Sequence, residues 1–587
     1  MTSKKVRKRK KKSKVVLSFE QKEQKKREKK LHVDVLNLFK RMGFEYIRTD
    51  GRPVTFGGQK SDIDNVFLYE NIILVCEETS GKDSEYNHLR KKYDFIERIG
   101  GHRDSFITWI KDIGKEKFGR FTEYLNARYR IFYLYFTENT IEEEKRSLYN
   151  KFKYIDGRNL RYFLKIADSI RYSARNEFYK YLGLDFKHVG EAIASQRENI
   201  HSAVISPEDV SGMPLGVHLV SFVMTAKELL DCAYVFRKEN WDQETGYYYQ
   251  RLIEKKKINS IREFLTREKR TFIDSIIVSL PNDAKFYSAN KTGGKGDPID
   301  PKSISEVTSN AIIEIPYKIN SIGIIDGQHR VFGHHEGPDN KEEEIIADLR
   351  NKRHLFVTGL YYQNDFKESD KRKFESQLFL EINSKQKRVD AQLLQHIESL
   401  QDPLSPIGIA MSVIQKLNGR TPFVNLFILS EIDEKKNGIK TPSIVKFGLQ
   451  QLVEINNDKE GLFKYWPCED KMLLITDKES KQAEDIRKEY VSFCTEMIGK
   501  FFNAVKSSQE EAWTFDGKSK LLRVTAIVAF IQSFEKSIEV YKGVKDIPFY
   551  QKKLSQLKVD FMQEKFPYVS SQWPKLAEEI NKCWTSV

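Results

Sequence analysis

Two groups of residues in this sequence have the types and the spacing that chemistry on phosphates requires. The first is the run DGQHR at residues 326–330, which directly follows the apolar stretch at residues 322–325. The second is a set of carboxylates, in which Asp62 and Asp64 precede Glu77, and Glu77 is the thirteenth residue after Asp64. Each group needs particular secondary structure around it before its side chains can act together.

The DGQHR run predicts a strand that turns into a helix at an Asp-Gly pair. Such a turn presents unpaired backbone N–H groups, which attract anions. Gly327 would let a phosphate approach the backbone, and Arg330 would add a charge-assisted contact, with Gln328 and His329 as further donors. Asp326 could orient a water or hold Mg²⁺, or it could only cap the helix, and both interpretations stay open.

The carboxylates predict a hard oxygen site on a β-hairpin. We expect strands over 61–69 and 71–76, with Asp62 and Asp64 on one face of the first strand, since residues two apart share a face. The hairpin would bring Asp64 close to Glu77, and two such carboxylates suit Mg²⁺, which can activate water against a phosphoryl group. The alternative is an acidic hairpin that only faces solvent.

The elements around the two groups follow from hydrophobic periodicity. A helix is predicted over 18–41, capped by Ser18 and carrying an apolar stripe, and Gly43 should end it. The same patterns predict an extended segment at 44–47, a charged helix at 84–99, strands at 130–136, 217–223, 275–280, 312–315, 322–325 and 354–362, helices at 140–182, 226–237 and 258–265, a flexible loop at 284–303, and mostly helix from 367 to the end.

Composition sets the broad class. The chain has 587 residues, of which 40% are apolar and 31% are charged, and no stretch approaches the ~20 apolar residues of a membrane helix. The five cysteines form no CxxC pair, which favours reduced thiols in the cytoplasm over disulfides or a zinc knuckle. The net charge of the chain is +15, and residues 1–30 alone hold 15 Lys/Arg and 3 Glu. This distribution predicts a basic tail at 1–17. The tail could neutralise DNA phosphates, or it could act only as a solubilising segment.

The DGQHR run and its surroundings resemble the DGQHR-domain family, which includes DndB-like proteins and is similar to ParB and sulfiredoxin-like folds. Upstream, Tyr249-Gln250-Arg251 resembles the family's YQR element, and Ile258–Leu265 followed by Phe272–Leu280 resembles its helix-then-strand element. Downstream, Phe379–Lys387 resembles its "F-x-x-IN-x-x-QK" element. The resemblance implies a pocket for ATP or another NTP, lined by the motif and closed by Arg251, Asn383 and Lys387. No Walker A loop is present, which excludes a P-loop NTPase.

The region from about 20 to 185 resembles the PD-(D/E)xK restriction-endonuclease superfamily, and in particular its Mrr-like members. The helix, the Met42-Gly43-Phe44 turn and the order of Asp64 before Glu77 carry the resemblance. The sequence departs from the pattern, because the position expected to hold the lysine is Thr79 if Glu77 is the ligand, or Ser80 if Glu78 is. Lys82, Lys91 or Lys92 could supply that lysine, or cleavage could be lost while DNA binding is kept.

These observations predict an α/β multidomain protein: a basic tail (1–17), a restriction-endonuclease-like domain (18–200), a ParB/sulfiredoxin-like DGQHR domain (201–400) and a helical C-terminal region (401–587). The expected function is nucleotide-dependent DNA processing in bacterial DNA modification, restriction or antiviral defence, with NTP hydrolysis and metal-dependent cleavage as the activities. The alternative is a non-catalytic DNA-binding regulator, or an assembly subunit of a modification system. The expected partners are DNA, a nucleotide and Mg²⁺, and no association with a membrane is expected. The protein could also form a homo-oligomer or bind other proteins of a modification complex.

Overall fold

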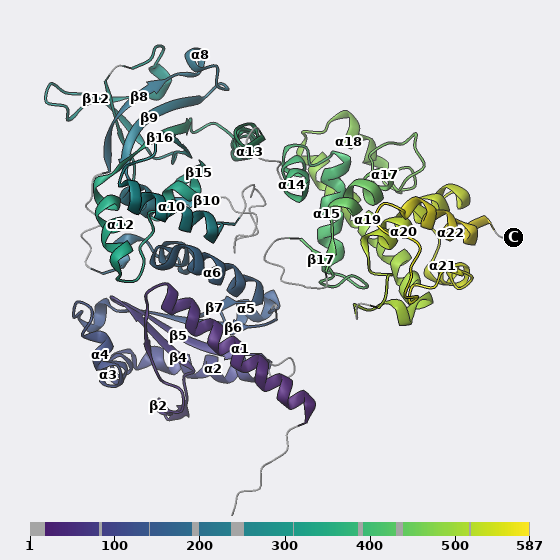
Figure 1. The fold of residues 1–587 in the computed structure, drawn as a ribbon, viewed down its shortest axis with the longest axis horizontal. Coiled ribbons are helices and arrows are strands. Elements are labelled where there is room, and N and C mark those ends of the chain that lie inside the picture. The colour runs from purple at the N-terminus through teal and green to yellow at the C-terminus, as the bar shows by residue number, and fades with distance from the viewer. Residues whose placement is uncertain are drawn as a thin grey trace, which may run out of the picture.

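The computed structural model of the chain combines two mixed β-sheets with a helical C-terminal region (Figure 1). It describes residues 18–80, 85–139, 141–190, 199–235, 252–308, 310–384, 391–429, 438–515 and 518–585. The predicted basic tail at 1–17 lies outside these residues.

The first sheet has five strands in the order β1-β4-β5-β6-β7. They are β1 (Glu45–Ile47), β4 (Asn65–Tyr69), β5 (Ile72–Thr79), β6 (Arg130–Thr137) and β7 (Phe152–Ile155), and a separate hairpin joins β2 (Val54–Phe56) to β3 (Gln59–Ser61). The pairs β1/β4 and β4/β5 are antiparallel, whereas β5/β6 and β6/β7 are parallel. The crossover that the parallel β5/β6 pair requires contains α2 (Glu85–Gly101), α3 (Arg103–Ile113) and α4 (Lys115–Phe118).

Helix α1 (Phe19–Arg41) begins and packs as the sequence predicts. Ser18 forms a capping box with Gln21, and the apolar stripe of the second half is buried. Gly43, at φ +81°, follows the helix in a left-handed conformation that favours glycine. The predicted helical stretch over 140–182 instead contains a strand: α5 (Glu143–Leu148) is followed by β7, and then by α6 (Gly157–Ile170) and α7 (Ala174–Leu182).

Strand β5 is buried on both faces, and its side chains alternate between two apolar cores. Leu74 and Cys76 belong to the core that also contains α1, α6 and α7, whereas Ile73 and Val75 belong to the core that contains α2 and α3. The same alternation directs Glu77 toward the α2 side and Glu78 toward the α1 side.

The second sheet has nine strands in the order β10-β15-β11-β16-β9-β8-β14-β12-β13. Their bounds are β8 (Ile200–Ser206), β9 (Val217–Thr225), β10 (Ala233–Val235), β11 (Ile276–Ser279), β12 (Lys285–Ala289), β13 (Lys295–Ile299), β14 (Ala311–Glu314), β15 (Ile322–Asp326) and β16 (His354–Tyr362). The helices of this part are α8 (Glu208–Ser211), α9 (Ala226–Cys232), α10 (Lys255–Glu268), α11 (Gln328–Phe332) and α12 (Lys341–Lys352).

Two predictions for this part are wrong. The Gly- and Lys-rich stretch at 284–303 is not a loop but contains the hairpin β12/β13, which is held because β12 also pairs with β14. The helix predicted over 226–237 ends at Cys232, because residues 233–235 pair in parallel with β15 as strand β10. In both places pairing with a distant strand overrides the local preference.

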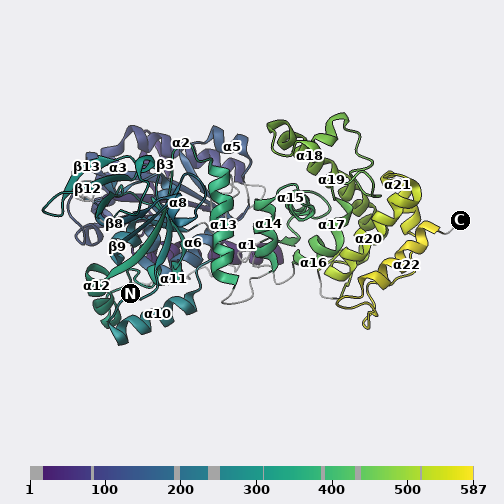
Figure 2. The same ribbon diagram turned by 90° about the horizontal axis from the view of Figure 1, so that it is seen from above.

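The C-terminal region is helical, as predicted, and has a separate apolar core over residues 409–584. Its helices are α13 (Glu368–Ser384), α14 (Ala391–Gln401), α15 (Pro406–Asn418), α16 (Pro442–Ile444), α17 (Gln450–Leu452), α18 (Leu473–Thr476), α19 (Lys481–Ser508), α20 (Val524–Tyr541), α21 (Ile547–Leu554) and α22 (Trp573–Thr585), with short strands β17 (Phe427–Ile428) and β18 (Ile439–Lys440). In Figures 1 and 2 the helices from α15 to α22 lie to one side of the two sheets, beyond α13 and α14.

One continuous core joins the two α/β parts, since it includes residues from Leu31 in α1 to Tyr361 in β16. All five cysteines are free thiols, and four of them are buried. Among the described residues, no helix combines the length and the apolarity that crossing a membrane would need.

Candidate functional site

Three side chains from three elements meet at the carboxyl end of β5. Asp64 lies directly before β4, Glu77 is on β5, and Lys92 is on α2. Because Asn65 pairs with Cys76 in the β4/β5 ladder, the next position in register places Asp64 opposite Glu77. The sheet therefore brings the two predicted carboxylates together, and α2 adds a lysine.

The lysine ammonium is the centre of this cluster. Lys92 Nζ lies 2.6 Å from Glu77 Oε2, 3.3 Å from Asp62 Oδ1 and 3.9 Å from Asp64 Oδ1. It also donates to the backbone carbonyl of Asp62 at 2.9 Å. The side chains of Lys92 and Glu77 are 5% and 0% exposed, so this ion pair is almost fully withdrawn from water.

Burial and charge shift the protonation of the cluster in a consistent way. Burial, reinforced by the charge of Asp64, raises the pKa of Glu77 well above its ordinary value, although Lys92 opposes the rise. Burial alone would lower the pKa of Lys92, but the surrounding carboxylates, with Glu77 first, raise it. Burial likewise favours neutral Asp62, yet Lys92 holds the pKa of Asp62 below its ordinary value. The ammonium is thus the fixed charge of the site.

The hairpin prediction is wrong in one detail. Residues 62–64 do not belong to the strand, because β3 ends at Ser61 and β4 begins at Asn65. Asp62 is more exposed than Asp64, at 54% against 29% of the side chain, so the two are not equivalent members of one strand face. They nevertheless converge on Lys92, which the bend between the strands permits.

Of the three lysines considered for the missing position, the structure brings Lys92 to the carboxylates. Lys91 is exposed, and Lys82 lies outside the described residues. The sequence does carry a signal that distinguishes Lys92. It lies on the same helical stripe as Leu89, Ile96 and Ile99, which are all buried, so a lysine occupies a core position of an amphipathic helix.

A second polar cluster, which sequence reasoning missed, lies on the α1 side of β5. His32 Nδ1 is 3.2 Å from Glu78 Oε2, and Asn65 Nδ2 donates to the same carboxylate. The backbone N–H of Glu78 donates to Asp64 Oδ2 at 2.8 Å, which links the two clusters. The hydrogen bond and charge of Glu78 raise the pKa of His32 despite partial burial.

The donor set fits a divalent cation with few protein ligands. Among the described residues, no group of three or more His, Cys, Asp or Glu side chains is arranged to hold a metal ion. Mg²⁺, however, usually keeps several waters and takes only one or two carboxylates. Asp64 and Glu77 would supply two, which lie side by side at the end of the sheet, with Glu77 Oε2 paired to Lys92.

The DGQHR run has the predicted strand-to-helix geometry. Strand β15 ends at Asp326, Gly327 has φ +92°, and α11 begins at Gln328. A Cβ at position 327 would lie 2.7 Å from Ile276 Cδ1 and 3.1 Å from Arg330 Nη2, so both the conformation and the space require glycine.

The polar side chains of the run are engaged within the protein. Arg330 Nη2 donates to Asp326 Oδ2 at 2.9 Å, and Arg330 Nη1 lies 3.7 Å from Asp274 Oδ2. His329 Nε2 accepts from the backbone N–H of Glu254 at 3.2 Å, so this nitrogen carries no proton there. Gln328 is buried. Arg330 Nη1 is buried without a hydrogen-bond partner in the described part of the chain.

Of the three residues predicted to close the DGQHR pocket, the structure describes only Asn383. Asn383 lies in the last turn of α13, where its side-chain amide donates to the Phe379 carbonyl at 2.8 Å. Phe379 packs in the same apolar cluster as Ile325 of β15, so α13 covers the strand that leads into the motif. Arg251 and Lys387 lie outside the described residues, and so does the Tyr249–Arg251 element.

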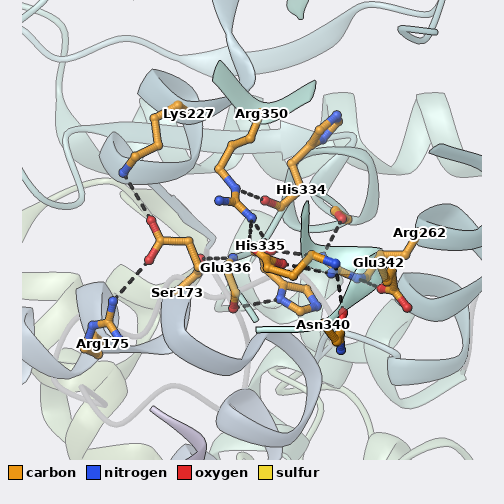
Figure 3. A network of polar contacts seen from close by, with 12 residues as sticks. Ser173, Arg175, Lys227, Arg262, His334, His335, Glu336, Asn340, Glu342 and Arg350 are labelled. Atoms are coloured by element: carbon orange, nitrogen blue, oxygen red, sulfur yellow. Dashed lines mark hydrogen bonds and ion pairs between the residues drawn. The ribbon is translucent and has the colours of Figure 1, made fainter. Parts of the chain in front are cut away.

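The segment directly after α11 connects the two α/β parts through partly buried ion pairs (Figure 3). Glu336 pairs with Arg175 of α7 at 3.1 Å and with Lys227 of α9 at 3.4 Å. Its backbone N–H donates to Ser173 Oγ, and Arg175 Nη1 donates to the Met42 carbonyl at 2.7 Å. The DGQHR part is thereby tied to the turn between α1 and β1.

The same segment is anchored on its other side by two arginines. Arg262 Nη1 and Arg350 Nη2 both donate to the His335 carbonyl (Figure 3). Both guanidinium groups also pair with Glu343. Burial, with the arginine charges, lowers the pKa of His334 to about 4 and that of His335 to about 3. Both imidazoles are therefore neutral at pH 7.

A cavity of about 710 Å³ lies between α1, α6 and the start of α10. It is lined by Lys30 and Arg41 of α1, by Arg161 and Asp168 of α6, and by Lys255, among others. In the described structure none of the five DGQHR residues lines it, although the neighbouring Glu254 contacts His329. Asp168 already pairs with Arg41 and Lys255, which balances part of the charge.

No family model matches this chain, and comparison with the curated proteins and with the solved structures finds no match either.

Proposed function

We propose that the N-terminal part is a restriction-endonuclease-like domain that hydrolyses phosphodiester bonds of DNA, with Asp64, Glu77 and Lys92 as its catalytic residues. The observation that carries the proposal is the ion pair of Lys92 with Glu77, beside Asp64, at the end of β5. The cluster is framed by α1, by the antiparallel strands β1, β4 and β5, and by the crossover that leads through α2 to the parallel strand β6, and the helix, turn and Asp-before-Glu order that carry the resemblance all lie in this part.

Each residue has a distinct task in this proposal. Asp64 and Glu77 would hold Mg²⁺, which when bound polarises water and the scissile phosphate. Lys92 keeps its proton and stabilises negative charge on the attacked phosphate, since a buried ammonium acts in a low-dielectric setting. Glu78 holds the Asp64 carboxylate through its backbone N–H and so fixes the direction of Asp64.

Cleavage of duplex DNA in Mg²⁺ or Mn²⁺ tests the proposal. The variants Asp64→Asn and Glu77→Gln should each reduce the rate by about 10²-fold or more, because each removes a charge at the metal site. Asp94→Asn is the matched control, since Asp94 is an exposed carboxylate on α2 outside the cluster. Absence of wild-type cleavage on plain and on modified DNA would favour the alternative, a DNA-binding regulator without catalysis.

A second function, phosphate or nucleotide binding at the DGQHR turn, is favoured by one observation. Arg330 Nη1 is buried and lacks a hydrogen-bond partner among the described residues, although it lies 3.7 Å from Asp274 Oδ2 and the other nitrogen, Nη2, is ion-paired with Asp326. A phosphoryl oxygen could take up that donor. On this proposal NTP binding or hydrolysis gates DNA processing, in the setting of modification, restriction or antiviral defence that the family resemblance implies.

Binding and hydrolysis of ATP, GTP, CTP and UTP, with and without DNA, test the second function. Arg330→Ala should weaken nucleotide binding at least tenfold, since a charge-assisted hydrogen bond contributes about 1.5–3 kcal/mol. Arg267→Ala, which removes an exposed guanidinium from α10, should leave binding unchanged. Equal binding by both variants would remove the DGQHR turn as the nucleotide site.

A further inference from the structure

Helix α1 carries an exposed basic stripe that runs toward the carboxylate cluster. Residues 25–30 and Lys22 are exposed, whereas the second half of the helix packs into the core. Lys22, Lys25, Lys29 and His32 are spaced at i, i+3, i+7 and i+10, so they lie within an arc of about 80° on the helix surface. We call these four residues the α1 stripe.

The structure fixes which way the α1 stripe faces. His32, its last member, contacts Glu78, whose backbone N–H holds Asp64. About two turns earlier, Gln24 Nε2 donates to Ser80 Oγ at 3.0 Å, three residues after Glu77. Both contacts lie at the carboxyl end of β5, so the stripe begins beside Glu78 and extends away from it along the projecting half of α1 (Figure 1).

Two of the three acidic residues of this half lie away from the stripe. Glu20 and Glu23 lie on the opposite flank of the helix by the same periodicity, and Glu23 is 3.7 Å from Lys26. Glu28 lies beside Lys25 and His32, where it accepts a hydrogen bond from Gln24 at 3.1 Å and offsets one of the stripe's charges. Lys26, Arg27 and Lys30 point to the other flank, where Lys30 lines the cavity beside α6.

The site is partly exposed at the end where His32 lies. The side chains of Asp62, His32 and Asp64 are 54%, 37% and 29% exposed, whereas those of Glu77 and Lys92 are buried. A polyanion bound along the stripe could therefore contact the exposed carboxylates. The stripe spans roughly 15 Å along the helix, which matches about four phosphates of one DNA strand at 3.4 Å each.

We propose that the α1 stripe binds the phosphate backbone of duplex DNA and leads the strand to Asp64 and Glu77. The inference rests on the proposed function for its substrate, and it adds the surface that positions that substrate. Lysines bind phosphates as point charges without reading sequence, so the contact supplies affinity and register rather than base specificity.

Two triple variants of the full chain test the proposal. Lys22→Gln, Lys25→Gln and Lys29→Gln together remove three charges from the stripe. Lys26→Gln, Arg27→Gln and Lys30→Gln together remove the same charge from the other flank of the same exposed helical segment. Binding to a labelled duplex is measured by fluorescence anisotropy in EDTA, which prevents cleavage, across 50–300 mM salt.

The stripe variant should lower the slope of log K against log salt by about 2–3, and affinity at 0.1 M salt by up to about 10²-fold. The other-flank variant should lower the slope by less than about 1. Equal effects of the two variants, or no DNA binding by the wild type, would overturn the proposal. If the stripe variant loses affinity but the wild type never cleaves DNA in Mn²⁺, the proposed hydrolysis fails and the DNA-binding surface stands.

Discussion

Replacing Lys92 by methionine should destabilise the first sheet locally, because it leaves Glu77 buried without its partner. At 2.6 Å and an effective dielectric constant of about 20, the Coulomb attraction between the two groups is about 6 kcal/mol. Desolvation offsets part of this energy, and loss of one partner of a buried pair costs about 3–5 kcal/mol. Hydrogen exchange of β5 and α2 should therefore become about 10²–10⁴-fold less protected.

The loss should depend on pH in a definite direction. A carboxyl with a raised pKa in the folded protein gives stability that is present below its ordinary pKa and is lost as the pH rises toward the raised value. Burial raises the pKa of Glu77, and Lys92→Met removes the charge that opposes this rise. Protection in Lys92→Met, corrected for intrinsic exchange rates, should thus fall as the pH rises from 5 to 8, by up to about tenfold per pH unit.

The double variant Glu77→Gln with Lys92→Met gives the control. Without a buried carboxylate, it should recover at least about 1 kcal/mol relative to Lys92→Met, and its protection should lose the pH dependence. A Lys92→Met variant whose protection changes by less than tenfold, equally at pH 5 and pH 8, would refute the buried ion pair as described.

Four further predictions follow from other parts of the structure. Gly327→Ala should lower the melting temperature in differential scanning fluorimetry, since Gly327 has φ +92° and a Cβ would meet Ile276; an unchanged melting temperature would contradict the tight turn. Arg175→Ala should cost about 3–5 kcal/mol in the hydrogen exchange of peptides around Met42 and Glu336, whereas the exposed Arg128→Ala should cost little. His334 and His335, neutral when folded, bind protons more readily when unfolded, so stability should fall as the pH drops from 6.5 toward 4, and a His335→Gln variant should show a shallower fall in urea unfolding. Deleting residues 1–14 should lower the salt slope of DNA binding, and an unchanged slope would remove the DNA role of the tail.

Local sequence signals predicted the elements that rely on local chemistry. The Ser18 cap and the stripe from Leu31 to Phe39 predicted α1, and the alternation over His354–Tyr362 predicted β16 with both ends correct. The DGQHR run predicted a turn whose left-handed glycine the structure contains. In each case the information lies within a few turns or residues of the element itself.

The errors occur where distant pairing decides. Strands β7 and β12 lie in stretches whose composition suggests helix and loop, and each is a strand because a remote neighbour supplies its hydrogen bonds. The choice among Lys82, Lys91 and Lys92 also depends on the fold, because it requires knowing which face of α2 is turned toward the sheet. The burial of Leu89, Ile96 and Ile99 around Lys92 is the one periodic signal that could have selected it.

The most direct test of the proposed active site is the single-turnover cleavage of duplex DNA in Mn²⁺ by Lys92→Met compared with Lys91→Met. The two lysines are adjacent on α2, and Lys91 is exposed. Each variant removes one positive charge, so a difference between them reports the position of Lys92 beside the carboxylates and not the loss of charge alone. We predict a loss of at least about 10²-fold for Lys92→Met and a change of less than threefold for Lys91→Met. Wild-type cleavage that survives Lys92→Met, with the variant shown to be folded at the assay temperature, would contradict the assignment of Asp64, Glu77 and Lys92 as one catalytic centre.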